Sequence, residues 1–156
     1  MAYISVRPER HSYDIIKRTG EFVINLTNEA LAEATDWCGV RSGRNFDKFK
    51  ECGLTAEKSA VVAAPSIAES PISIECRVKE IIPLGSHDMF IGEVVNVAVD
   101  EEYLDAETGK LNVEKMRLLA YAHGAYFTIG EQIGTFGWTV KGSTRRKEMR
   151  RGRAKK

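Results

Sequence analysis

Arginine and hydroxyl side chains gather near the N-terminus, at a point where the sequence predicts the start of a helix. Pro8 ends the first predicted strand because proline has no N–H for a strand ladder, and a helix is expected over residues 12–19. Arg7 and Arg10 lie in the loop between them. The first N–H groups of a helix have no partner inside it, so these side chains and the Ser12 hydroxyl suit a phosphate group. The alternative is that Ser12 caps the helix and both arginines are solvated surface charges.

A second segment has similar chemistry. Arg41, Ser42 and Arg44 lie in a glycine-containing loop that runs into a short predicted helix carrying Lys48. Two basic, hydroxyl-bearing helix starts in one small domain make an anionic ligand more plausible than one does. The alternative for Lys48 is a lysine on a solvated helix face.

His87 occupies the predicted turn between two long strands. One interpretation is an exposed turn histidine, and the other is a side chain aimed at a ligand from the rim of a barrel. Asp88 is not expected to form a catalytic pair with it, because adjacent residues on a strand point to opposite faces.

The elements that must position these groups are mostly strands. Alternation of apolar and polar residues over 72–79 predicts one buried face and one wet face, which carries Glu75. The return strand, 89–99, is apolar with little alternation, as in a strand covered on both sides. Long antiparallel strands of this kind suit a closed barrel or an interface better than an open sheet with one buried face. Further strands are expected at 2–7, 21–26, 121–130 and 134–140, and residues 59–65 are expected to form a short strand or an extended run. We also expect a helix from Thr27 or Asn28 to a left-handed Gly39, and a helical turn at 114–119.

Composition bounds the class of protein. The chain has 156 residues, of which 43% are hydrophobic, and it contains no apolar run long enough to span a bilayer. We therefore expect one domain, and we expect it in the cytoplasm because the N-terminus resembles no secretory signal. Three cysteines without Cys-x-x-Cys spacing argue against a disulfide framework and a zinc site, so reduced, buried thiols are expected, and no metal.

Charge separates along the sequence. The last sixteen residues hold nine Lys or Arg and one Glu, whereas the preceding 140 residues have a net charge of −7. We expect a domain over residues 1–141 and a basic, disordered tail over 142–156. Nucleic-acid binding is not expected as the main function, because no aromatic residues interleave the basic ones and the acidic domain would repel polyanions.

The order of several short motifs resembles the flavin reductase-like FMN-binding family, and most closely its flavoredoxin branch. The motifs run from residue 3 to about residue 140. They are Ile4-Ser-Val-Arg-Pro-x-Arg-x-Ser-Tyr13, Gly20-Glu-Phe-Val-Ile-Asn-Leu26, Ser42-Gly-Arg with Asp47-Lys-Phe49, Gly53-Leu-Thr55, Ala64-Pro65, Glu69-Ser-Pro71, Glu75-Cys76 and Ser86-His-Asp-x-Phe-Ile-Gly-Glu-Val94.

This resemblance implies a mainly β fold with short helices: an FMN-binding split barrel, built as a Greek-key antiparallel barrel and working as a homodimer. Members move electrons between flavin and a reduced nicotinamide or a redox protein. The resemblance assigns no catalytic residue, since the cofactor carries the chemistry. The resemblance places six residues near FMN: Arg10, Ser12, Ser42, Lys48, His87 and Tyr126. Some of them are assigned by a motif, whereas Tyr126 is chosen from several aromatic residues near the C-terminus.

Two further expectations follow. No Gly-x-Gly-x-x-Gly pattern is present, so an NAD(P)H donor would dock transiently on the flavin. Family members also begin with a strand pair and an Asn-x-Met-Thr-x-x-Trp-like segment ahead of the equivalent of Tyr3, and this sequence has neither. The alternative function is therefore a split-barrel dimer without tightly bound flavin, serving as a binding module or an inactive shortened homologue.

Overall fold

The computed structural model describes residues 1–140, and the predicted tail lies outside the described residues. The two longest strands, β5 and β6, have 12 residues each, and the other strands are short. The strands and α-helices are, in chain order, β1 Ala2–Val6, α1 His11–Thr19, β2 Glu21–Leu26, α2 Ala32–Val40, α3 Lys48–Glu51, β3 Ala56–Glu57, β4 Ser66–Ile67, β5 Ile72–Pro83, β6 Asp88–Val99, α4 Val113–Met116, β7 Leu119–Ala122 and β8 Ala125–Thr128. Two 3-10 turns lie at Glu29–Leu31 and Glu101–Tyr103.

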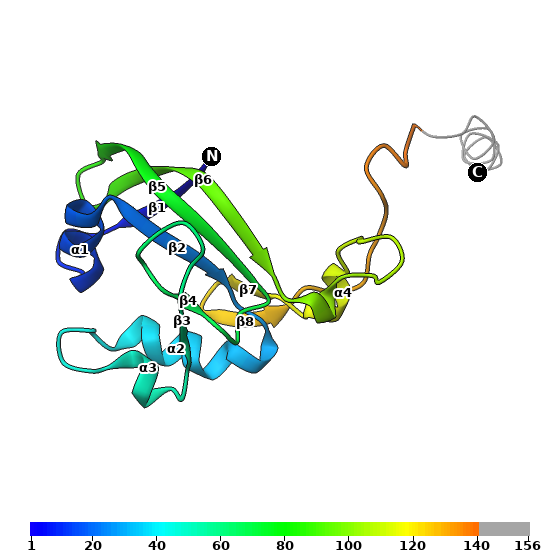
Figure 1. Cartoon of the computed structure of the whole chain (residues 1–156), viewed down its shortest axis with the longest axis horizontal. Coiled ribbons are helices and arrows are strands. Elements are labelled where there is room, and N and C mark those ends of the chain that lie inside the picture. The colour runs from blue at the N-terminus through cyan, green and yellow to red at the C-terminus, as the bar shows by residue number, and fades with distance from the viewer. Residues whose placement is uncertain (141–156) are drawn as a thin grey trace, which may run out of the picture.

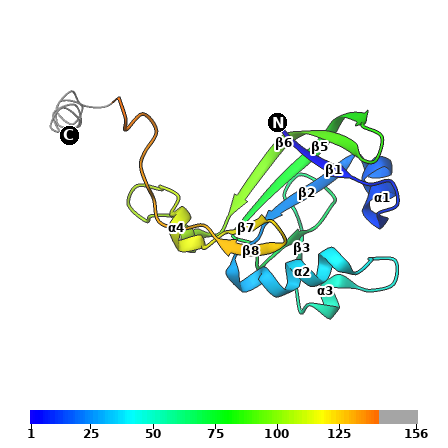
Figure 2. The ribbon, with the colours of Figure 1, turned by 180° about the vertical axis from the view of Figure 1, so that it is seen from behind.

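Four antiparallel strands form the main sheet, in the order β1-β6-β5-β2. The sheet curls into a half-barrel, with α1 at one end, α4 at the other, and α2 and α3 together on one side (Figures 1 and 2). Strands β5 and β6 form the central hairpin, whose register shifts between Glu75 and Cys76 and again between Val78 and Glu80. Two small hairpins, β3-β4 and β7-β8, complete the fold, so the predicted mainly β split barrel with short helices is confirmed.

The core lies between α1 and the concave side of the sheet. Tyr13 and Ile16 of α1 pack with Phe22, Cys76 and Phe90 from three strands. The T-shaped contact of Tyr13 with Phe90, at 5.4 Å between ring centroids, fixes the helix on the sheet. A glycine in β6 allows this packing, since a Cβ on Gly92 would lie 2.8 Å from the Phe22 ring.

The prediction that Glu75 lies on a solvent-exposed face of β5 is wrong, because its side chain is only 1% exposed. Its carboxylate accepts hydrogen bonds from the backbone N–H groups of Ala60, Val61 and Val62 at 2.7–3.0 Å, and from the Asn96 amide at 2.8 Å. Burial alone would raise the pKa of Glu75, but these hydrogen bonds outweigh it and hold the pKa at about 2. The buried group is therefore a carboxylate that ties a loop to the sheet.

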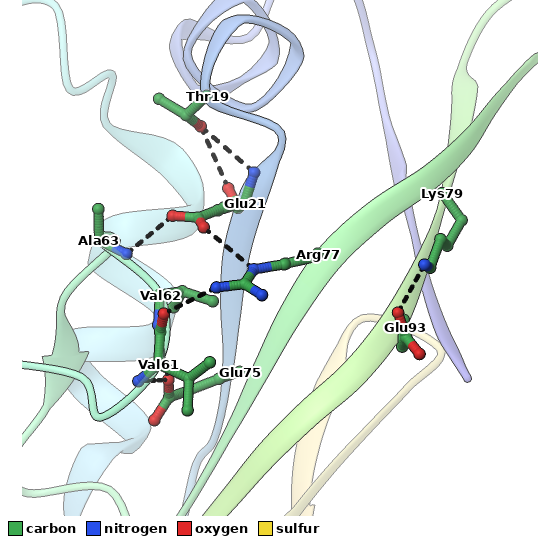
Figure 3. Close-up of polar contacts among 9 residues, drawn as sticks. All are labelled: Thr19, Glu21, Val61, Val62, Ala63, Glu75, Arg77, Lys79 and Glu93. Carbon is green, nitrogen blue, oxygen red and sulfur yellow. Dashed lines mark hydrogen bonds and ion pairs between the residues drawn. The ribbon is translucent and has the colours of Figure 1, made fainter.

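This loop contradicts one of the two predictions for residues 59–65, because they form no strand. Side chains from the sheet satisfy its backbone instead. Besides the bonds to Glu75, Ala63 N–H donates to Glu21 at 2.8 Å and Arg77 donates to the Val61 carbonyl at 3.2 Å, as Figure 3 shows. The sequence predicted a short strand or an extended run that ends at Pro65, but the backbone hydrogen bonds of this segment go to side chains of β2 and β5.

The C-terminal expectations also change. In place of one strand over residues 121–130, β7 and β8 form a hairpin, because His123 and Gly124 both adopt positive φ, at 50° and 80°, and turn the chain back. Residues 134–140 contain turns and no strand. Gly39 lies inside α2, which ends at Val40 without a left-handed residue.

Two broader features concern exposure. The second long strand is not covered on both faces throughout, because Val97 of β6 is 51% exposed. Of the cysteines, Cys76 is buried as expected, whereas Cys38 and Cys52 are only half-buried.

Across residues 1–140, no helix combines the length and apolar character needed to cross a bilayer.

Candidate functional site

A cleft of about 980 Å³ opens between the first turn of α1 and the end of α2. The end of β1, the loop after α2 and the start of α3 complete its walls. Four of the six predicted site residues line it together. They are Arg10, Ser12, Ser42 and Lys48.

The α1 wall carries the first predicted cluster. Arg10, in an extended conformation, precedes the helix and makes no side-chain cap, so Ser12 lies inside the first turn rather than at the cap position. Its hydroxyl is therefore not used as a helix cap. The helix N-terminus, with N–H groups that have no partner inside the helix, faces the cleft beside Arg10 and Ser12.

The opposite wall is formed where α2 and α3 meet. Lys48 Nζ donates to the backbone carbonyl of Cys38 at 2.5 Å, which ties the start of α3 to the last turn of α2. Asp47 caps α3 by accepting from the Lys50 N–H at 3.3 Å. An ammonium has three N–H donors, so Lys48 keeps two for another group.

The two walls touch through a residue pair that the sequence analysis missed. The His11 ring lies 3.1 Å from the point where a Cβ on Gly43 would stand, and both residues line the cleft. This contact joins the two basic segments that were predicted separately. Nothing local in the sequence signals it, since the residues are far apart along the chain.

The cleft is rich in positive charge. Arg7, at the end of β1, pairs with Glu9 at 3.5 Å, and both side chains are largely exposed. Within residues 1–140, Arg10 and Arg41 form no ion pair with a carboxylate, although Arg41 lies 5.7 Å from the Phe46 ring centroid. Two guanidinium groups are thus available to an anionic ligand.

The cleft wall that carries Lys48 also contains one of two neighbouring thiols. Cys38 of α2 and Cys52, directly after α3, have sulfur atoms 3.7 Å apart. Burial, together with the contact to Cys52, raises the pKa of the Cys38 thiol, and nearby Lys48 acts in the opposite direction. Only Cys38 lines the cleft.

The other two predicted site residues lie outside the lining of the cleft. His87 is in the β5-β6 turn, where its Nδ1 lies 3.0 Å from the Ser86 hydroxyl oxygen. The neighbouring Asp88 accepts from the Tyr13 hydroxyl at 2.6 Å, which places the turn beside α1. Tyr126, on β8, donates to Asp36 of α2 at 3.2 Å. Their roles in cofactor binding stay predictions.

Comparison with known proteins agrees with this architecture. The family model described as the flavin reductase like domain matches residues 1–130. The chain belongs to the flavin reductase-like family. An uncharacterized protein from Archaeoglobus fulgidus is 29% identical over 125 residues, which cover 80% of this chain and 69% of the relative.

Solved structures of similar proteins give the same family. Flavoredoxin of Desulfovibrio vulgaris (Miyazaki F) aligns with a TM-score of 0.77 and 29% identity, covering 85% of this chain and 73% of that one. Flavoredoxin from Methanosarcina acetivorans aligns with a TM-score of 0.76 and 27% identity, covering 88% and 75%. These neighbours support a flavin-related role in oxidation–reduction or electron transfer for this flavin reductase-like chain.

The relatives are longer than this chain. The chain spans 69% of the protein from Archaeoglobus fulgidus, 44% of one from Aeropyrum pernix and 66% of one from Aquifex aeolicus. The ligand and the activity of this flavin reductase-like domain are therefore matters for proposal.

Proposed function

We propose that the cleft binds FMN and that the protein is an FMN-dependent oxidoreductase or electron-transfer flavoprotein. The observation that carries this is the meeting of Arg10, Ser12, Ser42 and Lys48 in one cleft. Its volume of about 980 Å³ lies at the upper end of the range usual for small-molecule sites. The neighbouring flavoredoxin structures support flavin as the ligand class.

The residues present fit the anionic end of FMN. Arg10 is free of ion pairs among residues 1–140, and the Ser12 side chain and the α1 N-terminus lie beside it. Guanidinium groups, hydroxyls and helix N-termini are the usual partners of a phosphate. Ser42, across the cleft, accepts from Arg44 N–H at 3.3 Å and retains its O–H as a donor.

Lys48 is the residue proposed to lie near the flavin ring. Bound flavin would supply the redox chemistry, so the protein's part is to bind, orient and adjust charge. With its position set by the Cys38 carbonyl, the ammonium presents a localised positive charge to the cleft. A fixed cation there stabilises the more negatively charged state of a ligand. Flavin gains negative charge on reduction, so the cation would favour the reduced state.

The proposal extends to partners. We expect a reduced nicotinamide or a redox protein to donate electrons by transient docking, since the cleft is open and the sequence has no dinucleotide-binding glycine motif. We also expect a homodimer. Tyr121 and Phe127 on the β7-β8 hairpin, and Phe136 beyond it, are 55–100% exposed, and aromatic groups of this kind are enriched at protein interfaces.

An FMN titration of the purified chain, followed by flavin absorbance and fluorescence, tests the proposal. We expect saturable binding with a Kd in the micromolar range or tighter, which is about −8 kcal/mol. Lys48→Ala and Ser12→Ala should each weaken it by about 10- to 100-fold, since one charge-assisted hydrogen bond contributes about 1.5–3 kcal/mol.

Lys50→Ala is the matched control, because Lys50 lies on the same short helix, is exposed and does not line the cleft. Its affinity should equal that of the wild type. Absence of any spectral change at high flavin would reject the proposal and favour the alternative, a split-barrel dimer without flavin. An equal loss in Lys48→Ala and Lys50→Ala would reject the assignment of Lys48.

A further inference from the structure

The half-buried thiols of Cys38 and Cys52 form a pair that flavin binding does not explain. Their sulfur atoms lie 3.7 Å apart although the residues are 14 positions apart along the chain. Cys38 belongs to the last part of α2, and Cys52 follows α3 directly. Two different helices therefore bring the thiols together.

The surroundings hold the pair in place. The Lys48 ammonium bonds to the Cys38 carbonyl at 2.5 Å, and Cys52 N–H donates to the Lys48 carbonyl at 3.2 Å. Lys48 thus contacts both cysteine residues through their backbones. Cys38 is only half-buried and also lines the solvent-open cleft, which gives a small reagent a route toward this residue.

We propose that Cys38 and Cys52 form a reversible disulfide, a modification site in the wall of the cleft that is oxidised by small-molecule disulfides. A disulfide needs its sulfur atoms about 2.05 Å apart. The proposal requires the gap of 3.7 Å to close through movement of the two side chains. The third thiol, Cys76, is buried in the core and is not part of the pair.

The reaction balances as two exchange steps. The Cys38 thiolate attacks one sulfur of the small disulfide, whose S–S bond breaks and whose other half leaves as a thiolate. The Cys52 thiolate then attacks the Cys38 sulfur of the mixed disulfide and releases the second half. The cysteine pair loses two electrons, the small disulfide gains them, and the two thiol protons end on the two small thiols.

Oxidation would act on the cleft through Lys48. The new bond would join the end of α2 to the end of α3, and Lys48 contacts the backbone of both partners. We therefore expect bound FMN and the disulfide to influence each other. This consequence rests on the proposed function, whereas formation of the disulfide does not.

The test uses the full chain without flavin, under conditions where its circular dichroism is native. The protein is equilibrated with mixtures of reduced and oxidised glutathione, the remaining thiols are then alkylated in denaturant so that the buried Cys76 also reacts, and the intact mass is measured. We expect a species with one alkylated thiol and no attached glutathione, which returns to three alkylated thiols after dithiothreitol. Peptide mapping should show Cys38 linked to Cys52.

Cys38→Ser and Cys52→Ser are the matched variants, and each should retain attached glutathione or two free thiols, with no internal bridge. Three alkylated thiols in wild-type protein under oxidising conditions would overturn the proposal, as would a bridge that includes Cys76 or joins two chains. Peptide mapping of the wild type decides the matter even if a serine variant folds poorly. Because no flavin is present, a failed FMN titration leaves this result unaffected.

Discussion

The His11 ring of α1 lies 3.1 Å from the point that a Cβ atom on Gly43 would occupy. The first turn of α1 and the loop after α2 therefore meet at a residue that has no side chain. This contact brings the Ser12 segment and the Ser42 segment to one cleft. The cleft depends on a small residue at position 43.

Gly43→Val should weaken FMN binding several-fold, because its branched side chain would displace the His11 ring into or away from the cleft. Stability should change by less than about 1 kcal/mol, since the site is not in the core. FMN titration and urea unfolding measure the two effects. The same substitution in a His11→Ala background should cost less affinity, and an equal loss in both backgrounds would show that the contact is not the cause.

Glu75→Gln should destabilise the fold by about 1–3 kcal/mol, because an amide nitrogen would replace an oxygen that accepts from backbone N–H groups. Urea unfolding gives the change. Glu93→Gln on β6 is the control: its pair with Lys79, at 2.7 Å, is about half exposed and screened by solvent, so its effect on stability should be much smaller. Equal effects in the two variants would contradict the structural role of Glu75.

Stability should also fall in acid through Glu75. Its pKa is about 2 in the folded protein, below the unfolded value of about 4.3, so the unfolded chain binds the proton first. The contribution is complete above about pH 4.3 and is lost as the pH falls toward 2. Between these pH values, the free energy of unfolding should change less with pH in Glu75→Gln than in the wild type. The same pH dependence in both proteins would contradict the low pKa.

Tyr13→Phe should lower the melting temperature, because it removes the 2.6 Å hydrogen bond that links α1 to Asp88 beside the β5-β6 turn. That bond, burial and the Asp88 charge raise the pKa of Tyr13 above its ordinary value. Its contribution is therefore present below about pH 10 and declines as the pH rises through the folded pKa.

The thermal unfolding of Tyr13→Phe should accordingly depend less on pH in the alkaline range. Tyr3→Phe is the matched control, since Tyr3 is 65% exposed, and it should behave as the wild type does. A melting temperature of Tyr13→Phe equal to that of Tyr3→Phe would show that the link to Asp88 does not matter.

His87→Ala and Tyr126→Phe should each reduce FMN affinity less than Lys48→Ala, because neither side chain lines the cleft of a single protomer. FMN titration of the three variants at equal protein concentration makes the comparison. A loss for His87→Ala or Tyr126→Phe that matches Lys48→Ala would show that these residues reach the flavin, for example across a dimer interface.

Much of the local structure is determined by the sequence alone. Strand β2 has the predicted bounds, β1, β5 and β6 lie within a few residues of theirs, and Asn28 accepts from Leu31 N–H at 3.1 Å at the predicted helix start. Apolar periodicity, proline and capping residues act over a few neighbours, so the sequence shows them directly. The motif order also indicated the family.

Only the tertiary structure decided which distant segments meet. It turned Glu75 from the expected wet face into a buried carboxylate, because the loop 60–62 folds back to donate to it. It also placed His11 on Gly43 and Cys38 beside Cys52. These contacts join residues from different elements, and their free energy depends on the packing of the whole sheet and its helices, which no local pattern in the sequence records.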